Sequence, residues 1–260
     1  MTIDGFALAG LVTPWVYGAL LVFCRIGAAF MLMPGLGEAQ VPVRARLVVA
    51  LAVSLALTPA VDGVPLPVPA DAVTILAHVF GNILAGALLG VGARLLLSAL
   101  HVAAQAAAQQ MGLSNPFTAA VPGFEGASAL SAFFVMCGVA VTFAADLHHL
   151  LIQALAGSFR LVPVDGIPDG GLQAQVVIRA AGQAMRLAVQ FAAPFLVIGL
   201  VANVGLGITN RMMPALPVFF VFSPLLIGAG LVLAFLVAGA VMALYADAVG
   251  LWLRDGGMPP

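Results

Sequence analysis

The chain has 260 residues, of which 63% are apolar and only 7% are charged. A soluble domain carries about 25% charged residues, so this chain cannot keep a water-facing surface solvated. It is predicted to be an integral membrane protein. The net charge is −1, with nine arginines and no lysine, which leaves no basic patch for binding nucleic acid.

Six apolar runs predict helices that cross or enter a membrane. A bilayer core needs about 20 apolar residues per helix. The runs cover residues 15–33, 47–61, 72–93, 127–145, 187–210 and 218–246. Arg25 interrupts the first run. Because a charge at membrane depth is costly, we expect Arg25 to snorkel, or to pair with Glu38 or with an acid of another subunit.

Three linkers separate these runs. Residues 62–71 are rich in proline and predict an extended connection, and residues 162–171 form a second break. Residues 210–217 predict a short turn between the last two runs. The turn makes residues 187–246 a helical hairpin.

The arginines do not indicate an orientation in the membrane. If the N-terminus lies inside, four arginines outside the first run fall on each side, whereas the positive-inside rule depends on a bias. The tie indicates that some apolar segments are buried against other protein. Small residues at four-residue spacing, Gly86 with Gly90 and Gly199 with Asn203 and Gly207, indicate close helix packing within the chain or between subunits.

Two amphipathic stretches, residues 94–110 and 172–190, are predicted to be helices with polar side chains on one face. The polar residues follow steps of three or four, so each set shares an arc of about 80°. The first polar stripe is Arg94, Ser98, His101, Gln105 and Gln109, and the second polar stripe is Gln175, Arg179, Gln183, Arg186 and Gln190. Such groups must face protein or a water-filled cavity. The stripes therefore pair with each other or with headgroups, or they line an aqueous path.

The segment QQMGLSNPFTAAVPGFEG at residues 109–126 is unusual for a connector. It contains three glycines, two prolines and two phenylalanines, but only one charge. The preceding helix is predicted to end at Gly112, because glycine is a natural C-terminal breaker. The composition raises the question of whether the segment is a connector or a working part.

No catalytic, cofactor or metal site is predicted. His148 and His149 follow Asp146 at the end of a run, and the spacing allows a hydrogen bond between Asp146 and His149. Adjacent helical residues point about 100° apart, so the two histidines are not expected to share a metal. Ser114 and Ser158 lack a nucleophile elbow. The chain is therefore not expected to be an enzyme.

Five stretches, taken in order, resemble the FliR/SctT family of type III export apparatus proteins. They are RIGAAFMLMPGLGEAQVPVRARLVVALAVSLALTP at 25–59, QMGLSNPF at 110–117, LHHLLIQALAGSFRLVPV at 147–164, FAAPFLVIGLVANVGLGITNRMMPALPVFF at 191–220 and SPLLIGAGLVL at 223–233. The resemblance implies an all-α integral membrane protein with about six apolar helical segments and two amphipathic helices, some of them kinked. It implies a FliP-like portion over 1–186 and a FliQ-like hairpin and tail over 187–260.

The resemblance also implies a function. Family members assemble with FliP-like and FliQ-like subunits, and meet FlhB-like and FlhA-like components, in the bacterial inner membrane at the flagellar basal body. The assembly is a gated channel for unfolded export substrates, in which a loop, here 111–125, acts as a plug. The implied plug residues are Met111, Gly112, Leu113, Ser114, Asn115, Pro116, Phe117, Val121, Pro122, Gly123 and Phe124. Gly112, Gly123 and Gly126 would be its hinges.

Two other functions are weighed against this one. A secondary transporter for a small solute would need a midplane site and an inverted repeat, and no convincing repeat is present. A membrane enzyme would have to use His148, His149 and Asp146, which lack a nucleophile and a base in suitable geometry. The leading hypothesis is a non-enzymatic subunit of an export channel.

Overall fold

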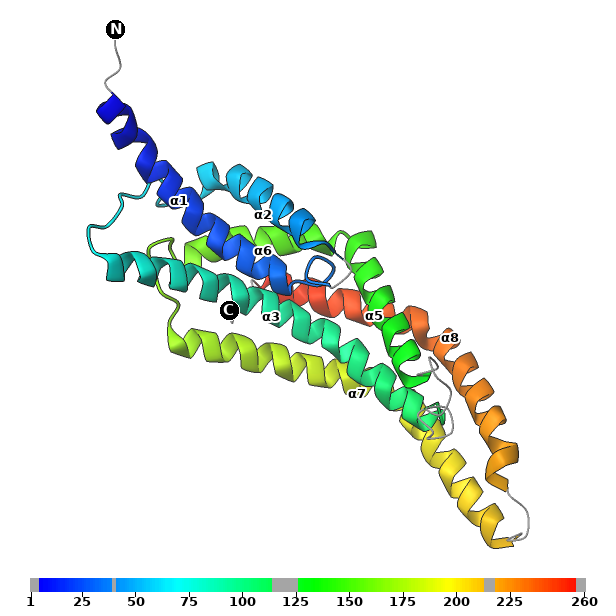
Figure 1. The fold of residues 1–260 in the computed structure, drawn as a ribbon. Coiled ribbons are helices and arrows are strands. Elements are labelled where there is room, and N and C mark those ends of the chain that lie inside the picture. The colour runs from blue at the N-terminus through cyan, green and yellow to red at the C-terminus, as the bar shows by residue number, and fades with distance from the viewer. Residues whose placement is uncertain (1–4, 39–40, 114–125, 213–217, 256–260) are drawn as a thin grey trace. The chain divides into compact units, whose positions relative to one another are not determined.

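The computed structural model describes residues 5–38, 41–113, 126–212 and 218–255, and every regular element within these ranges is a helix (Figure 1). The elements are α1 (Gly5–Leu32), α2 (Val43–Leu57), the short 3-10 helix η1 (Thr58–Ala60), α3 (Ala72–Gln110), α5 (Gly126–Ala144), α6 (Leu147–Leu161), α7 (Gly170–Met212) and α8 (Val218–Arg254). The all-α prediction is confirmed.

Within the described residues, five helical stretches are long and apolar enough to cross a membrane, and the number is six if the bent pair α5–α6 is counted as one span. The five are Val12–Leu32, Val43–Ala60, Ala72–Gln110, Gln173–Met212 and Phe222–Arg254. The prediction of about six apolar segments with some kinks is therefore confirmed. The break in the bent pair falls next to Asp146, whose φ of 56° is left-handed.

The two amphipathic stretches are not separate helices. Residues 94–110 continue the apolar run 72–93 as a single α3, and residues 172–190 continue into 187–210 as a single α7. A change from apolar to polar composition does not end a helix when the residues at the junction are good helix formers. Helix α6 was not among the predicted apolar runs, because its polar positions interrupt the hydropathy pattern.

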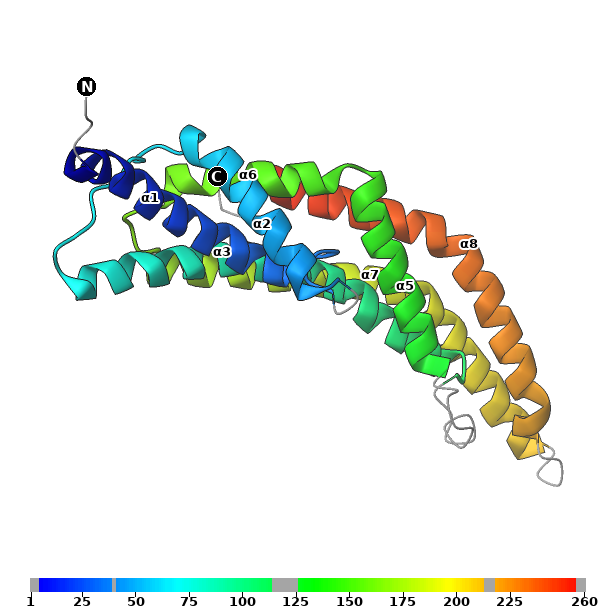
Figure 2. The ribbon, with the colours of Figure 1, turned by 45° about the horizontal axis from the view of Figure 1, so that its top comes forward.

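The predicted linkers are present. Residues 62–71 run from η1 to α3 as an extended segment that folds back on α1, where Leu66 N–H donates to the Pro14 carbonyl at 3.3 Å. The break at 162–171 separates α6 from α7. In the predicted hairpin, the second half of α7 and the first half of α8 lie side by side in both views (Figures 1 and 2). Residues 213–217 of its turn lie outside the described residues.

The chain divides into two compact units that interleave along the sequence. Unit 1 contains residues 1–95, 146–181 and 249–260, and unit 2 contains residues 96–145 and 182–248. In unit 1, α3 packs closely on α1 through Gly86 and Gly90. A Cβ at Gly90 would lie 2.8 Å from the Ala29 carbonyl oxygen, and one at Gly86 would overlap the carbonyl oxygen of Arg25. This glycine pair serves packing within the chain.

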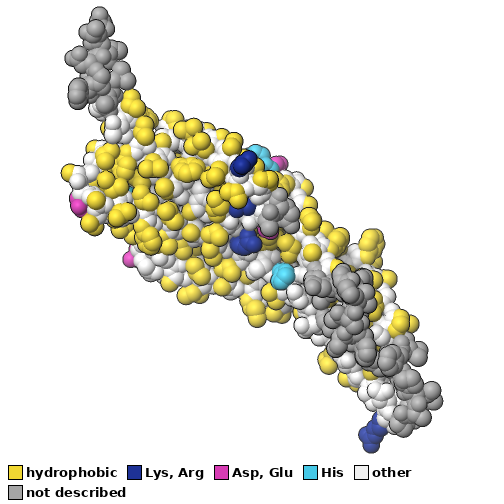
Figure 3. All heavy atoms as spheres, viewed as in Figure 1, with side chains coloured by type: hydrophobic (Ala, Val, Ile, Leu, Met, Phe, Trp, Pro, Cys, Tyr) yellow, Lys and Arg dark blue, Asp and Glu magenta, His cyan; other side chains and the backbone are white. Residues whose placement is uncertain are grey.

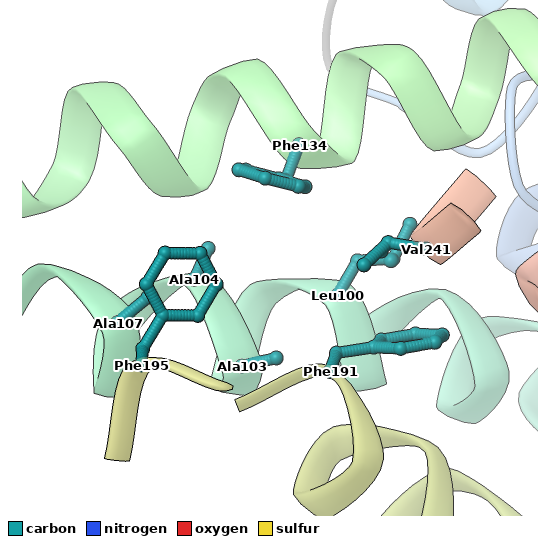
Figure 4. A pocket seen from close by; sticks show the side chains of 8 residues that line it. All are labelled: Leu100, Ala103, Ala104, Ala107, Phe134, Phe191, Phe195 and Val241. Atoms are coloured by element: carbon teal, nitrogen blue, oxygen red, sulfur yellow. The ribbon is translucent and has the colours of Figure 1, made fainter. Parts of the chain in front are cut away.

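The core of unit 2 is formed by α3, α5, α7 and α8. Leu100, Phe134, Phe191 and Val241 surround a cavity of about 10 Å³, which is about the size of one water probe (Figure 4). On α3, the side chains facing this cavity include three alanines, so aromatic rings from the other helices approach the helix closely. The helices are therefore closely packed around this cavity.

The outer surface is strongly apolar. Hydrophobic side chains dominate the face shown in Figure 3, and Phe235 on α8 is 83% exposed. Leu200 and Val201 on α7 and Leu236 on α8 are also exposed. Exposed apolar area of this extent marks a surface covered by lipid or by other protein.

Candidate functional site

The base of the 111–125 segment is a well-formed helix end. Gly112 has a φ of 73°, its N–H donates to the Gln109 carbonyl at 3.2 Å, and Leu113 N–H donates to the Ala108 carbonyl at 2.9 Å. These two bonds are the Schellman pattern, which needs a left-handed residue at the position of Gly112. The prediction that the helix ends at Gly112 is confirmed.

The residues before this cap are packed against neighbouring helices of unit 2. Met111 is only 2% exposed, and its side chain fills the space in which a Cβ on Gly230 of α8 would lie. The Gln110 side chain likewise fills the space in which a Cβ on Gly199 of α7 would lie. Met111 thus anchors the start of the segment. The other predicted plug residues, Ser114, Asn115, Pro116, Phe117, Val121, Pro122, Gly123 and Phe124, lie outside the described residues.

An apolar groove of about 490 Å³ opens at the same place. Leu113 lines it at one end, Leu130 and Phe133 line it from α5, and Leu231 and Phe235 line it from α8. Leu113 is the last described residue before the plug residues, and α5 begins directly after them. The described N-terminal end of the segment, at Leu113, therefore lies beside an uncharged, apolar surface.

A polar link joins the two helices that flank the segment. His101 of α3 and Ser131 of α5 are joined by a 2.6 Å hydrogen bond between Nδ1 and Oγ, and Ser131 is 1% exposed. Gln105 lies 3.4 Å from the other ring nitrogen of His101. Sequence analysis found His101 and Gln105 from their spacing but missed Ser131, whose only signal was a hydroxyl in an apolar run.

Ser131→Ala should therefore loosen α5 from α3. The variant loses the partly buried bond to the His101 ring and a longer one, 3.5 Å, to the His101 carbonyl, so we expect the free energy of unfolding to fall by about 1 kcal/mol. Thermal melting of the purified chain in detergent measures this. Thr209→Val is the matched control, since the Thr209 hydroxyl donates to the Gly205 carbonyl of its own helix, at 2.8 Å on an exposed face. Equal melting points for the two variants would contradict the linking role of Ser131.

The two polar stripes lie largely on the outside of the chain. In the first, Arg94, His101 and Gln109 are exposed, while Ser98 and Gln105 are half-buried. In the second, only Gln183 is half-buried, and the exposed members are Gln175, Arg179, Arg186 and Gln190. Polar rows on an otherwise apolar exterior are what a water-filled path or a polar subunit contact requires.

The end of the first stripe makes an ion pair. Arg94 Nη1 lies 3.8 Å from Glu38 Oε1. Arg46 Nη2 donates to the Glu38 backbone carbonyl at 2.9 Å, which holds the same turn from α2. The carboxylate of Glu38 therefore pairs with Arg94, and the predicted pairing of Arg25 with Glu38 is wrong.

Arg25 instead lies at the centre of a buried network in unit 1. The guanidinium donates to Asn82 Oδ1 at 3.0 Å and to the carbonyls of Val162 at 2.8 Å and Pro163 at 3.3 Å. Ser158 Oγ accepts a further bond at 3.4 Å. Arg25 is fully buried, and its guanidinium lies 4.1 Å from the centre of the Phe159 ring.

This network joins α1 to α3 and to the end of α6. Asn82 also donates to the Val164 carbonyl at 2.7 Å, so the linker after α6 is held from two helices. Arginine suits this position because its planar guanidinium has five N–H donors. The last carbonyls of a helix have no partner within the helix, so the carbonyls at the end of α6 need donors from elsewhere. Asn82 was missed by sequence analysis, although a lone amide in an apolar run was a usable signal.

The group Asp146, His148 and His149 is closer together than expected. The spacing of Asp146 and His149 allows a hydrogen bond, and Oδ1 of Asp146 lies 3.3 Å from Nδ1 of His149. The centres of the two imidazole rings lie 4.1 Å apart. One possible ligand atom from each of the three residues lies within 4.8 Å of the other two. The possible ligand atoms of the two histidines are therefore closer together than the 100° separation of their Cα–Cβ directions suggests. Imidazole is long enough to bring the nitrogens together even where the Cα–Cβ directions diverge.

Comparison with known proteins gives a consistent result. A family model described as bacterial export proteins, family 1, matches residues 16–251. The flagellar biosynthetic protein FliR of Caulobacter vibrioides is 36% identical over 233 residues, which are 89% of this chain and 92% of that protein. FliR of Aquifex aeolicus is 30% identical over 217 residues, with 84% of this chain and 83% of that protein covered.

FliR of Escherichia coli is 26% identical over 207 residues, which cover 80% of this chain and 78% of that protein. The family match begins within α1 and ends within α8, so it takes in the segment, both stripes and the Arg25 network. The resemblance inferred from five short motifs is thereby confirmed. The chain belongs to the bacterial export proteins, family 1, the family of these flagellar FliR proteins.

Proposed function

We propose that this flagellar export protein is a core subunit of a gated channel for unfolded export substrates, and that its 111–125 segment is the plug. Membership of the family makes the chain a membrane component of flagellar export and a transport protein rather than an enzyme. The main support is the composition of the segment, which is apolar and nearly uncharged. Its base is fixed by buried Met111 and by the helix cap at Gly112, beside an apolar groove.

The physics of a plug explains this composition. A channel for polypeptides must stop ions when idle, and a hydrophobic constriction does so by excluding water. Phe117, Val121 and Phe124 supply the apolar surface. Glycine and proline let such a segment change conformation without breaking a helix ladder. The firm cap at Gly112 confines any such change to the residues after it.

The remaining surfaces suit association with other subunits. We propose FliP-like and FliQ-like neighbours, together with FlhB-like and FlhA-like components, in the inner membrane at the flagellar basal body. The apolar residues exposed on α7 and α8 support such contacts. In this proposal residues 1–186 correspond to a FliP-like portion and 187–260 to a FliQ-like hairpin and tail. The two polar stripes face the aqueous lumen or the polar parts of these interfaces.

The test is ion leakage through the assembled complex in liposomes. Residues 114–125 are replaced by a glycine-serine segment of equal length, which keeps the cap at Gly112, Leu113 and the start of α5. Without its apolar side chains the segment cannot exclude water, so we expect leakage to rise several-fold over the wild-type complex.

The matched control is a scrambled 114–125 segment, which keeps the apolar composition and is expected to remain tight. Assembly with the partner subunits is checked for each variant by gel filtration. Unchanged leakage in an intact glycine-serine complex would overturn the plug. Solute transport by the purified chain alone would overturn the channel-subunit function and favour a secondary transporter.

A further inference from the structure

The turn between α5 and α6 carries three metal-ligating side chains on one short stretch. The carboxylate of Asp146 lies 3.3 Å from Nδ1 of His149, and the rings of His148 and His149 lie 4.1 Å apart. One ligand atom from each residue falls within 4.8 Å of the other two. We propose that these residues bind a divalent transition-metal ion, for which Zn²⁺ is the probe.

The donor set has the chemistry of such an ion. Two imidazole nitrogens and one carboxylate oxygen are ligands that zinc accepts at about 2.0–2.2 Å in a tetrahedral arrangement. The edge of a tetrahedron with bonds of that length measures roughly 3.3 Å, which is the present separation between the Asp146 and His149 atoms. The three possible ligand atoms lie within 4.8 Å of one another, so the proposal requires the His148 side chain to move closer to the other two.

The orientation of Asp146 is an independent observation. Asp146 stands at the N-cap of α6, where an aspartate normally accepts a hydrogen bond from the first helical turn. Its side chain makes no such bond and faces His149 instead. The backbone is left-handed at this residue, with φ 56° and ψ 20°, which is uncommon for a residue other than glycine.

The position is accessible and also well supported. Leu147, between the ligands, is buried, and its side chain lies 3.6 Å from where a Cβ on Gly250 of α8 would be. That contact holds the first turn of α6 while Asp146 and His149 remain exposed on the outer side. Three protein ligands leave a fourth position for water, and a bound ion would tie the turn to the helix.

The experiment uses the full chain purified in detergent through a tag without histidines and stripped of metal by a chelator. Titration calorimetry with ZnCl₂ is expected to give saturable binding of one ion per chain. The double variant His148→Ala/His149→Ala should lose this binding. Asp146→Asn should weaken it by at least about tenfold, the size of effect that even outer-shell changes have on zinc sites.

The other two histidines provide matched controls. His78 bonds Tyr17 at 3.1 Å and His101 bonds Ser131, so neither belongs to the group. His78→Ala and His101→Ala should each retain one ion per chain. If the double variant does not fold, His149→Ala, which changes an exposed side chain, gives the same test. No saturable binding by the wild type, or equal binding by the wild type and the ligand variants, would overturn the proposal.

Discussion

Arg25→Ala should lower the free energy of unfolding by at least about 3 kcal/mol. The change removes four hydrogen bonds and the contact with the Phe159 ring, and it leaves the Asn82 amide oxygen and the Val162 carbonyl buried without the arginine donor. Each unsatisfied buried acceptor costs about 1–3 kcal/mol. Because the same group ties α1, α3 and the end of α6, we expect loss of folded protein as well as a lower melting point.

The measurement is thermal melting of the purified chain in detergent, with the monodisperse fraction as a second readout. Arg25→Lys should be intermediate, because a lysine ammonium keeps the charge but lacks the planar fork that reaches several acceptors. Arg254→Ala is the control at an exposed arginine, and it should change stability by less than about 0.5 kcal/mol. A melting point for Arg25→Ala equal to that of Arg254→Ala would refute a stabilising network.

Local signals in the sequence were sufficient for most of the fold. The apolar runs predicted the spanning segments, and Gly112 predicted the end of α3 because glycine commonly ends helices. In the structure Gly112 has a φ of 73°, a conformation that glycine adopts without strain. Proline-rich stretches predicted the linkers. The continuity of α3 and α7 was not predicted, because hydropathy changes at residues 94 and 187 while helix propensity does not.

The candidate site was predictable only where it depends on spacing along one helix. Both polar stripes follow from steps of three and four. The partners of Arg25 lie 57, 133 and 137 residues away in sequence, at Asn82, Ser158 and Val162, and no periodicity reports contacts of that range. Ser131 was missed for the same reason. The group of Asp146, His148 and His149 is compact for another reason: Cα–Cβ directions alone do not fix the positions of the imidazole nitrogens.

Gly86→Ala should destabilise the chain by about 1–3 kcal/mol, although alanine is the better helix former. A Cβ on this residue would overlap the carbonyl oxygen of Arg25 and lie 2.8 Å from its carbonyl carbon. These are backbone atoms of α1, so no side-chain rotation relieves the overlap and α3 must move away. The melting point of the purified chain in detergent should fall.

Gly27→Ala is the matched control on α1, because an added Cβ there meets nothing within 4 Å. It should leave stability unchanged or raise it by up to about 1 kcal/mol. A Gly86→Ala variant as stable as Gly27→Ala would contradict the close packing of α1 on α3.

The two large effects should also be coupled. Asn82, which accepts from Arg25, stands one turn before Gly86 on α3, so a shift of α3 that relieves the overlap also lengthens the bond between Arg25 and Asn82. In the Arg25→Ala background the bond to Asn82 is already lost, so a shift of α3 no longer weakens it. The double variant Arg25→Ala/Gly86→Ala should therefore be destabilised by less than the sum of the single variants, by more than about 0.5 kcal/mol. Simple additivity would mean that the glycine contact and the arginine network stabilise the fold independently.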